Sequence, residues 1–333
     1  MISEKLSNKY KVCSVLATIF VVYRHSFVEQ AFLLRGSHVG DVLSNTTRLV
    51  STITEVAVPL FFIISGFFFF QKNYYKGNEY MKMLRKKFRT LFIPFVFWNL
   101  VGLLVLVASG KYEKTEGCLN FVENFFLSYN YGPLWYVRDL MLFMLFSPIY
   151  LWMMFQRYRW VWMIILPVLV YFWLPVDNRF VSVEGLLFFL VGGLLNFRVN
   201  ILSMKKNKIY PILLFAQWMA LAYSINLWEH EKIHKFSICL GILFLWFSID
   251  VIPKKIYCFL LKMSKYAFFV YVTHFYFVKT FKILIAHNFV GNEIVAWFTF
   301  IFLPIICIGV LILFAQLFSK KYNRIYSLLT GNR

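Results

Sequence analysis

The sequence KVCSVLATIFVVYRHSFVEQAF, residues Lys11–Phe32, begins as an apolar helix and then places Arg24, His25 and Glu29 in the same hydrophobic run. At about 1.5 Å of rise per residue, His25 lies roughly 21 Å along this helix, well inside a hydrocarbon layer about 30 Å thick. A charged side chain at that depth costs at least about 2.5–3.5 kcal/mol, so it should face a protein interior or a wet cavity. Glu29 shares a helix face with His25 and could fix the tautomer of its imidazole. We expect the other helices to build a cavity around His25.

The composition of the chain is that of a polytopic membrane protein. Its 333 residues are 60% hydrophobic and 21% aromatic, whereas soluble domains are nearer about 45–50% apolar. The net charge of +20 comes from basic residues scattered between apolar segments, which favours positive-inside topology over nucleic-acid binding. The five cysteines show neither metal-ligand nor disulfide spacing. The first apolar stretch has no cleavage site and should stay as a helix.

Apolar periodicity predicts an all-α bundle of about ten membrane spans in a single integral-membrane domain, residues 1–333. The expected spans are 12–33, 49–71, 90–109, 134–155, 160–175, 182–198, 209–227, 235–252, 266–286 and 294–318.

The distribution of lysine and arginine between the loops predicts the orientation. One side of the membrane would carry 24 of these residues and the other side seven. The seven are Arg35, Arg48, Lys111, Lys114, Arg179, Lys232 and Lys235. Both termini should therefore be cytoplasmic. The first cytoplasmic loop, 71–89, is strongly basic, and its last part should begin as a short amphipathic helix along the membrane surface.

Four separated stretches form a pattern along the chain: VVYRHSF in the first span, VAVPLFFIISGFFFF (56–70), GPLWYVRDLMLFMLFSPI (132–149) and YAFFVYVTHFYFV (266–278). In this order they resemble the acyltransferase family 3 membrane proteins, which O-acylate cell-surface sugars. The resemblance covers nearly the whole chain. It implies an inner (cytoplasmic) membrane enzyme that uses acyl-CoA. The sequence has no zinc-ligand spacing, so no metal is expected. Two positions depart from the family pattern: Ser14 stands where a basic residue is common, so Arg24 could substitute, and Lys86-x-x-Arg89 replaces R-x-x-R.

Acyl transfer to a sugar hydroxyl needs a base for the proton and donors for the developing oxyanion. Histidine titrates near neutral pH, and His25 is the best candidate. It would act either as the base or as a covalent acyl carrier, against the alternative of a buried histidine satisfied by a neighbour. His274, the second membrane histidine, would line the acyl path or pair with a carboxylate.

Three further groups of residues are candidates with structural alternatives. Arg138 would stabilise an oxyanion or hold a phosphate, or form an ion pair; it should not pair with Asp139, because adjacent helix residues do not face each other. Ser65 would donate to the acyl carbonyl, whereas Gly66 fits small-residue helix packing. Trp135, with Tyr136 after it, would contact the sugar acceptor, although interfacial aromatic belts explain such residues equally well.

The densest cytoplasmic basic cluster suits the phosphates of coenzyme A. It contains Arg85, Lys86, Lys87 and Arg89. An ordinary inside-positive loop that binds anionic lipid is the alternative.

The sequence therefore predicts a membrane O-acyltransferase. It would transfer acetyl from acetyl-CoA to a hydroxyl of a surface or secreted glycan, or of its lipid-linked precursor, with membrane lipid around it. The rival interpretation is an exporter of polysaccharide or lipid-linked sugar, with His25 and Arg24 lining a polar conduit; it would require inverted repeats and broken helices.

Overall fold

The computed structural model describes residues 3–28, 31–32, 40–71, 77–110, 118–127, 131–155, 168, 171, 181–197, 208–228 and 231–331. Within these residues the regular structure is entirely helical, in agreement with the predicted all-α class. They cluster into two compact units, whose boundaries fall inside two helices, after Phe61 and after Leu317.

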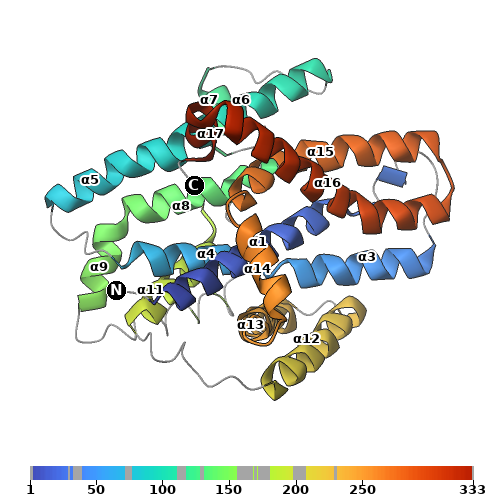
Figure 1. Ribbon diagram of the computed structural model, residues 1–333, viewed down its shortest axis with the longest axis horizontal. Helices are drawn as coiled ribbons and strands as arrows, with labels where there is room; N and C mark the ends of the chain where they lie inside the picture. The colour runs from blue at the N-terminus through green and yellow to red at the C-terminus, as the bar shows by residue number, and fades with distance from the viewer. Residues whose placement is uncertain are drawn as a thin grey trace. The chain divides into compact units, whose positions relative to one another are not determined.

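The first unit contains residues 1–61 and 203–317. Its helices are α1 (Glu4–His25), α3 (Asp41–Thr54), α12 (Ile209–Trp228), α13 (Glu231–Ser248), α14 (Lys254–Met263), α15 (Ala267–Asn288) and most of α16 (Glu293–Lys321). Helix α1 contacts α15, α3 and α14, and α12 pairs with α13 (Figure 1). The histidine-bearing helix therefore lies among three others.

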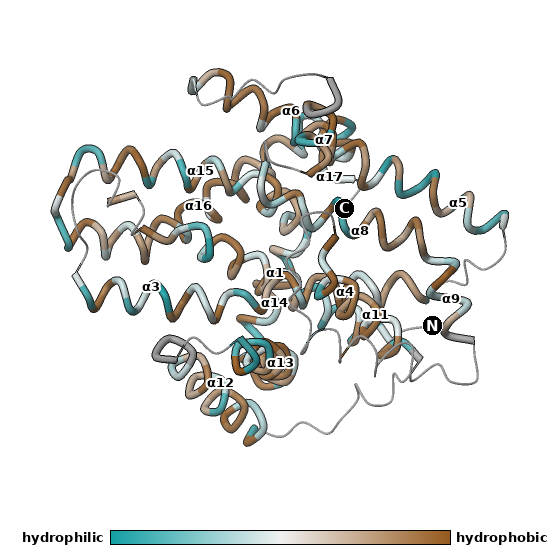
Figure 2. The backbone as a smooth tube through the Cα atoms, turned by 180° about the vertical axis from the view of Figure 1, so that it is seen from behind, coloured by the Kyte–Doolittle hydropathy of each residue, from teal (hydrophilic) through white to brown (hydrophobic). Residues whose placement is uncertain are grey.

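The second unit contains residues 62–202 and 318–333. Its helices are most of α4 (Ala57–Phe69), α5 (Gly77–Lys87), the π-helix η1 (Phe88–Phe92), α6 (Ile93–Ala108), α7 (Cys118–Phe126), the 3₁₀ turn η2 (Gly132–Leu134), α8 (Trp135–Leu145), α9 (Ser147–Phe155), α11 (Val183–Phe197) and α17 (Asn323–Thr330). Hydrophilic turns occur along α5 (Figure 2), which matches the amphipathic helix predicted before the third span.

Helix α1 begins and is anchored by polar contacts near its N-terminus. Ser3 is the N-cap, and its hydroxyl accepts from the backbone N–H of Leu6 at 3.3 Å, which satisfies one of the free donors of the first turn. Lys9 is buried; its ammonium lies 2.5 Å from Asp250, just after α13, and 4.0 Å from the ring centroid of Trp246. A buried charge needs such a partner, so this ion pair ties α1 to α13.

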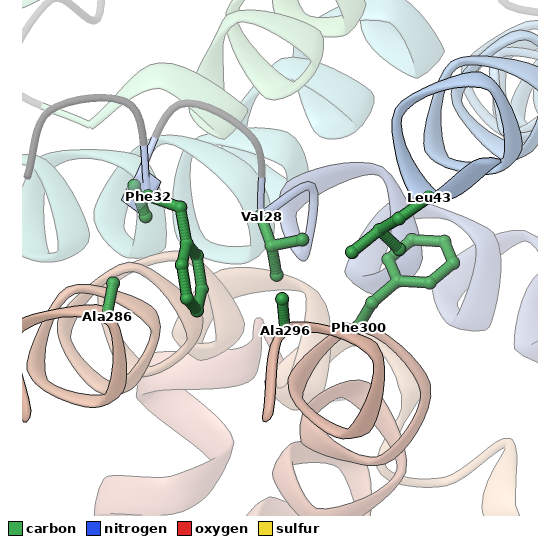
Figure 3. Close-up of a cluster of buried hydrophobic side chains, with 7 residues drawn as sticks. Val28, Phe32, Leu43, Ala286, Ala296 and Phe300 are labelled. Atoms are coloured by element: carbon green, nitrogen blue, oxygen red, sulfur yellow. The ribbon is translucent and has the colours of Figure 1, made fainter. Parts of the chain in front are cut away.

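A hydrophobic cluster forms just after the end of α1. Val28 and Phe32 pack with Leu43 of α3, Ala286 of α15 and Phe300 of α16 (Figure 3). All five are at most 5% exposed. Burial of a large side chain stabilises by about 1.5–3 kcal/mol, so this cluster holds together the helices around the C-terminal end of α1.

Within the described residues, four continuous helical stretches are long and apolar enough to cross a membrane, or five if one bent pair is a single span. The four are 41–69, 77–108, 267–288 and 293–321, and the bent pair is 132–145 with 147–153, at 59°. This finding establishes membrane character and leaves the ten spans, the cytoplasmic termini and the single domain as predictions. The predicted span 160–175 lies outside the described residues except for Val168 and Tyr171.

Several predicted boundaries are wrong. The first helix ends at His25 and starts at Glu4, rather than running over 12–33. Span 134–155 is divided at Phe146, whereas span 49–71 agrees with the continuous stretch 41–69, in which a turn at Glu55 and Val56 separates α3 from α4. The segment after Pro253, which lies between the predicted spans 235–252 and 266–286, forms the helix α14. Its apolar residues occupy one helix face, and a short basic amphipathic helix of this kind escapes a search for apolar runs.

Candidate functional site

Two histidines meet inside the first unit, and we call them the histidine pair. His25 is the last residue of α1, and His274 lies in α15. Their ring centroids are 5.2 Å apart, and the ring of Phe275 meets His25 edge-on at 5.1 Å. His25 is partly buried and His274 is fully buried. Sequence analysis singled out both residues, and the fold places them side by side.

The tautomer of His274 follows from the hydrogen bond that its Nδ1 makes with the backbone. Its Nδ1 lies 2.7 Å from the carbonyl oxygen of Tyr271, and a carbonyl can only accept, so Nδ1 carries the proton. In the neutral ring the lone pair is then on Nε2. This atom is buried and has no hydrogen-bond partner among the described residues. The histidine pair therefore includes an open acceptor, whose burial without a partner is unfavourable by about 1–3 kcal/mol.

Lys282 fixes the position at which α1 ends. This lysine of α15 donates from Nζ to the carbonyl oxygen of His25 at 3.1 Å and to that of Phe27 at 2.7 Å. The last carbonyls of a helix have no partner within the helix, and a cation there also interacts favourably with the helix dipole. Lys282 thus holds the backbone of His25 through the same helix that carries His274.

A second polar group surrounds Glu55, at the break between α3 and α4. Its carboxylate lies 2.7 Å from Nη2 of Arg24 and also contacts Nε2 of His234 in α13. Arg24 donates from Nη1 to the hydroxyl of Ser51 as well. The network joins α1, α3 and α13 immediately beside the histidine pair. Arg24, predicted to act with His25, is thus bound to Glu55, and Glu29, expected to orient His25, lies outside the described residues.

In the second unit, Ser65 hydrogen-bonds to the phenol of Tyr136 at 2.8 Å. The ring of Phe62 lies between this pair and Trp135, with centroid distances of 4.7 Å to Tyr136 and 6.2 Å to Trp135. Gly66 is tightly packed, because a Cβ there would lie 1.9 Å from the backbone oxygen of Phe189. Helix packing at Gly66 is therefore confirmed, and the roles of Ser65, Trp135 and Tyr136 towards a substrate stay predictions.

The expectation that Arg138 and Asp139 do not pair is wrong. Nη2 and Nε of Arg138 lie 2.7 and 2.8 Å from Oδ1 of Asp139, and both side chains are buried. Asp139 also accepts from the backbone N–H of Ser182 at 2.8 Å. Consecutive residues at the first turn of a helix can meet when the long arginine side chain folds back, and burial favours the pair over two separate unpartnered charges. Arg138 is thus in an ion pair, and its role towards an oxyanion or a phosphate stays a prediction.

The predicted basic cluster surrounds a depression of about 700 Å³, which we call the basic depression. It is lined by Lys82, Arg85, Lys86, Lys87, Arg89, Thr90 and Gly331. Gly331 follows α17 with φ of 67°, and a Cβ there would lie 2.0 Å from the carbonyl oxygen of Thr90, so only glycine fits. Arg89 and Thr90 lie in the π-helix η1, a rare element that is frequent at functional sites.

Three features of these sites were not predicted from the sequence. They are Lys282 at the end of α1, the network centred on Glu55, and Lys82 in the basic depression. Lys282 could have been found, since a lysine in an apolar helix is rare and usually functional. The partners of Glu55 could not have been found, because Arg24 and His234 are far apart in the sequence and reach Glu55 only through helix packing.

Together these features define a helical membrane protein with two contacting imidazoles, one of them fully buried, and a separate group of exposed basic side chains. A family model described as "Acyltransferase domain" (Acyl_transf_3) matches residues 14–314. The chain therefore belongs to this acyltransferase family, as its four motifs indicated.

One curated relative supports the assignment at a distance. The chain is 29% identical over 158 residues to the succinoglycan biosynthesis protein ExoH of Rhizobium meliloti (strain 1021). The match covers 44% of this chain and 42% of that relative. No solved structure matches the chain.

Proposed function

We propose that this protein is an O-acyltransferase that moves an acyl group, acetyl in the first instance, from acyl-CoA to a hydroxyl of a polysaccharide or of its lipid-linked precursor. Family membership supports acyl transfer, and the relative named for succinoglycan biosynthesis supports a polysaccharide acceptor. The observation that carries the proposal is the histidine pair, in which a partly buried imidazole, held by its backbone, faces a second imidazole with an open acceptor atom.

In the proposed reaction, His25 accepts the proton of the acceptor hydroxyl as that oxygen attacks the thioester carbonyl. The tetrahedral intermediate then expels the coenzyme A thiolate, which takes the proton back from the imidazolium. Nε2 of His274 accepts a hydrogen bond from a second hydroxyl of the acceptor sugar and orients it, because the single proton of the attacking hydroxyl goes to His25. In the covalent variant of the same scheme, the neutral imidazole of His25 attacks the thioester carbonyl and expels the coenzyme A thiolate. The hydroxyl then attacks the acyl-imidazolium and releases His25, and its proton passes by way of Nε2 of His274 to the thiolate.

The basic depression is the proposed site for the phosphates of the donor. Its cationic side chains are charge-complementary to a coenzyme with several phosphates, and its volume of about 700 Å³ lies within the roughly 300–1,000 Å³ of ligand sites. The acceptor would stack on Trp135 or Tyr136, and the protein would act in the inner membrane.

The direct test is transfer of radiolabelled acetyl from acetyl-CoA, in parallel with succinyl-CoA, to polysaccharide by the purified protein in detergent or nanodiscs. We expect labelled polysaccharide and free coenzyme A in equal amounts. Failure to consume any acyl-CoA, together with transport of polysaccharide into vesicles, would favour the exporter. Rapid quenching followed by mass spectrometry of the His25 peptide separates the two variants, because only the covalent one accumulates an acyl-imidazole.

A further inference from the structure

A second cavity lies in the first unit, between α1, α14 and α16, and we call it the lateral groove. Its volume is about 760 Å³, within the roughly 300–1,000 Å³ typical of small-molecule sites. Its lining is largely aliphatic and aromatic. It comprises Ile19, Tyr23, Phe259, Leu260, Lys262, Met263, Lys265, Tyr266, Ile305, Ile308, Gly309, Ile312, Leu313 and Gln316.

The charged side chains of the groove are all positive and come from one short segment. Lys262, in the last turn of α14, and Lys265, just after it, are exposed. The described lining contains no aspartate or glutamate. Two exposed ammonium groups beside an apolar surface, with no carboxylate among the lining residues, are complementary to an anion that is joined to hydrocarbon.

The opposite wall is an open, apolar side of α16. Ile305 and Leu313 are 54% and 61% exposed. Between them Gly309 removes a side chain, and the position that its Cβ would occupy has no atom within 4 Å. A glycine in the interior of a helix is unfavourable relative to alanine. At Gly309 the absence of a side chain leaves room for a hydrocarbon chain to lie against α16.

We propose that the lateral groove binds an anionic phospholipid, with the phosphate at Lys262 and Lys265 and one acyl chain along α16 past Gly309. The lysines select the headgroup by charge, and the isoleucines of α16 and Ile19 of α1 bury the chain. Tyr23, at the α1 wall, lies two residues before His25, so the bound lipid packs against the helix that carries the proposed base. The lipid site does not depend on the proposed function, since it follows from the groove alone.

The test is native mass spectrometry of the full chain released from micelles with phosphatidylglycerol and phosphatidylethanolamine of equal chain length. The wild type should retain phosphatidylglycerol in preference. In the double variant Lys262→Gln/Lys265→Gln, the ratio of retained phosphatidylglycerol to phosphatidylethanolamine should fall about thirtyfold. Each lysine near the membrane surface contributes about fivefold to the binding of an anionic lipid. The control Lys254→Gln/Lys255→Gln, at the other end of α14, should keep it, as should Lys262→Arg/Lys265→Arg, which preserves the charge.

The apolar wall is tested separately at Gly309. Gly309→Phe adds a Cβ that meets no neighbour and a ring that occupies part of the groove, and it should abolish retention of both lipids. Gly309→Ala adds only a Cβ and should leave retention unchanged. Equal retention of the two lipids by the wild type would overturn the proposal. So would a preference for phosphatidylglycerol that survives the double variant, or lipid binding unaffected by Gly309→Phe in a protein with unaltered thermal unfolding.

Discussion

The histidine pair and the basic depression hold their functional groups in different ways. His25 is fixed by ring contacts on its side chain and by a lysine on its backbone, and its partner is fully buried. In the basic depression, by contrast, Lys82, Arg85, Lys86 and Arg89 are exposed and close together in the sequence. A substitution in the histidine pair should therefore have a large effect, because no other residue replaces the lost group. A substitution in the basic depression should have a small effect, because the neighbouring like charges remain.

The largest expected effect is at His25. His25→Ala should lower kcat for acyl transfer by about 10²–10⁴-fold, the usual contribution of a general base. The matched control is His287→Ala, which removes an exposed histidine in the last turn of α15. Initial rates at saturating acetyl-CoA measure the effect. If the two variants lose the same amount, the histidine pair is not the site of proton transfer.

The second prediction concerns Lys282, which acts on His25 through the backbone. Lys282→Met should lower kcat by up to about 10²-fold, because a displacement of about 1 Å in a reacting group can have that effect. KM for acetyl-CoA should not change, and Lys282→Arg should restore part of the rate. Lys279→Met, which removes an exposed lysine one turn earlier on α15, should be active. If Lys282→Met has the wild-type kcat, the cation at the end of α1 does not contribute to acyl transfer.

The smallest effect is expected in the basic depression. Arg85→Gln should raise KM for acetyl-CoA at most about fivefold, because an exposed ion pair contributes only about 0–1 kcal/mol. The turnover number should not change, and wild-type KM should rise with ionic strength, since salt screens exposed charges. Arg324→Gln, in α17, serves as the control. A loss of turnover in Arg85→Gln, with KM unchanged, would contradict a role in donor binding alone.

The same contrast explains what the sequence could and could not reveal. The basic depression was predictable, because four of its cations lie within five residues and needed only a helix to bring them together. The candidacy of His25 and His274 was also predictable, since polar residues in apolar helices are rare. Their contact, and the contact between Glu55 and His234, depend on helix packing between residues more than 170 positions apart, for which local patterns give no signal.

Two further differences have local physical causes. The sequence placed His25 in the middle of a continuous helix because apolar residues continue to Phe32, yet α1 ends where Lys282 takes up its carbonyls. The basic segment after Pro253 lies between two predicted spans, yet it is helical, because Pro253 serves as the N-cap of α14 and the apolar residues of that helix share a face. Helix ends depend on such tertiary contacts, which makes them the least predictable feature.

The measurement that tests the central claim most directly is photo-crosslinking with a non-hydrolysable acyl-CoA analogue that carries a diazirine in its acyl chain. The account predicts that the analogue labels the peptides containing His25 and His274, that excess acetyl-CoA abolishes the labelling, and that removing the charges of the basic depression weakens it. Labelling that acetyl-CoA displaces but that lies only on other helices would contradict the account, because the acyl group would then react away from both imidazoles.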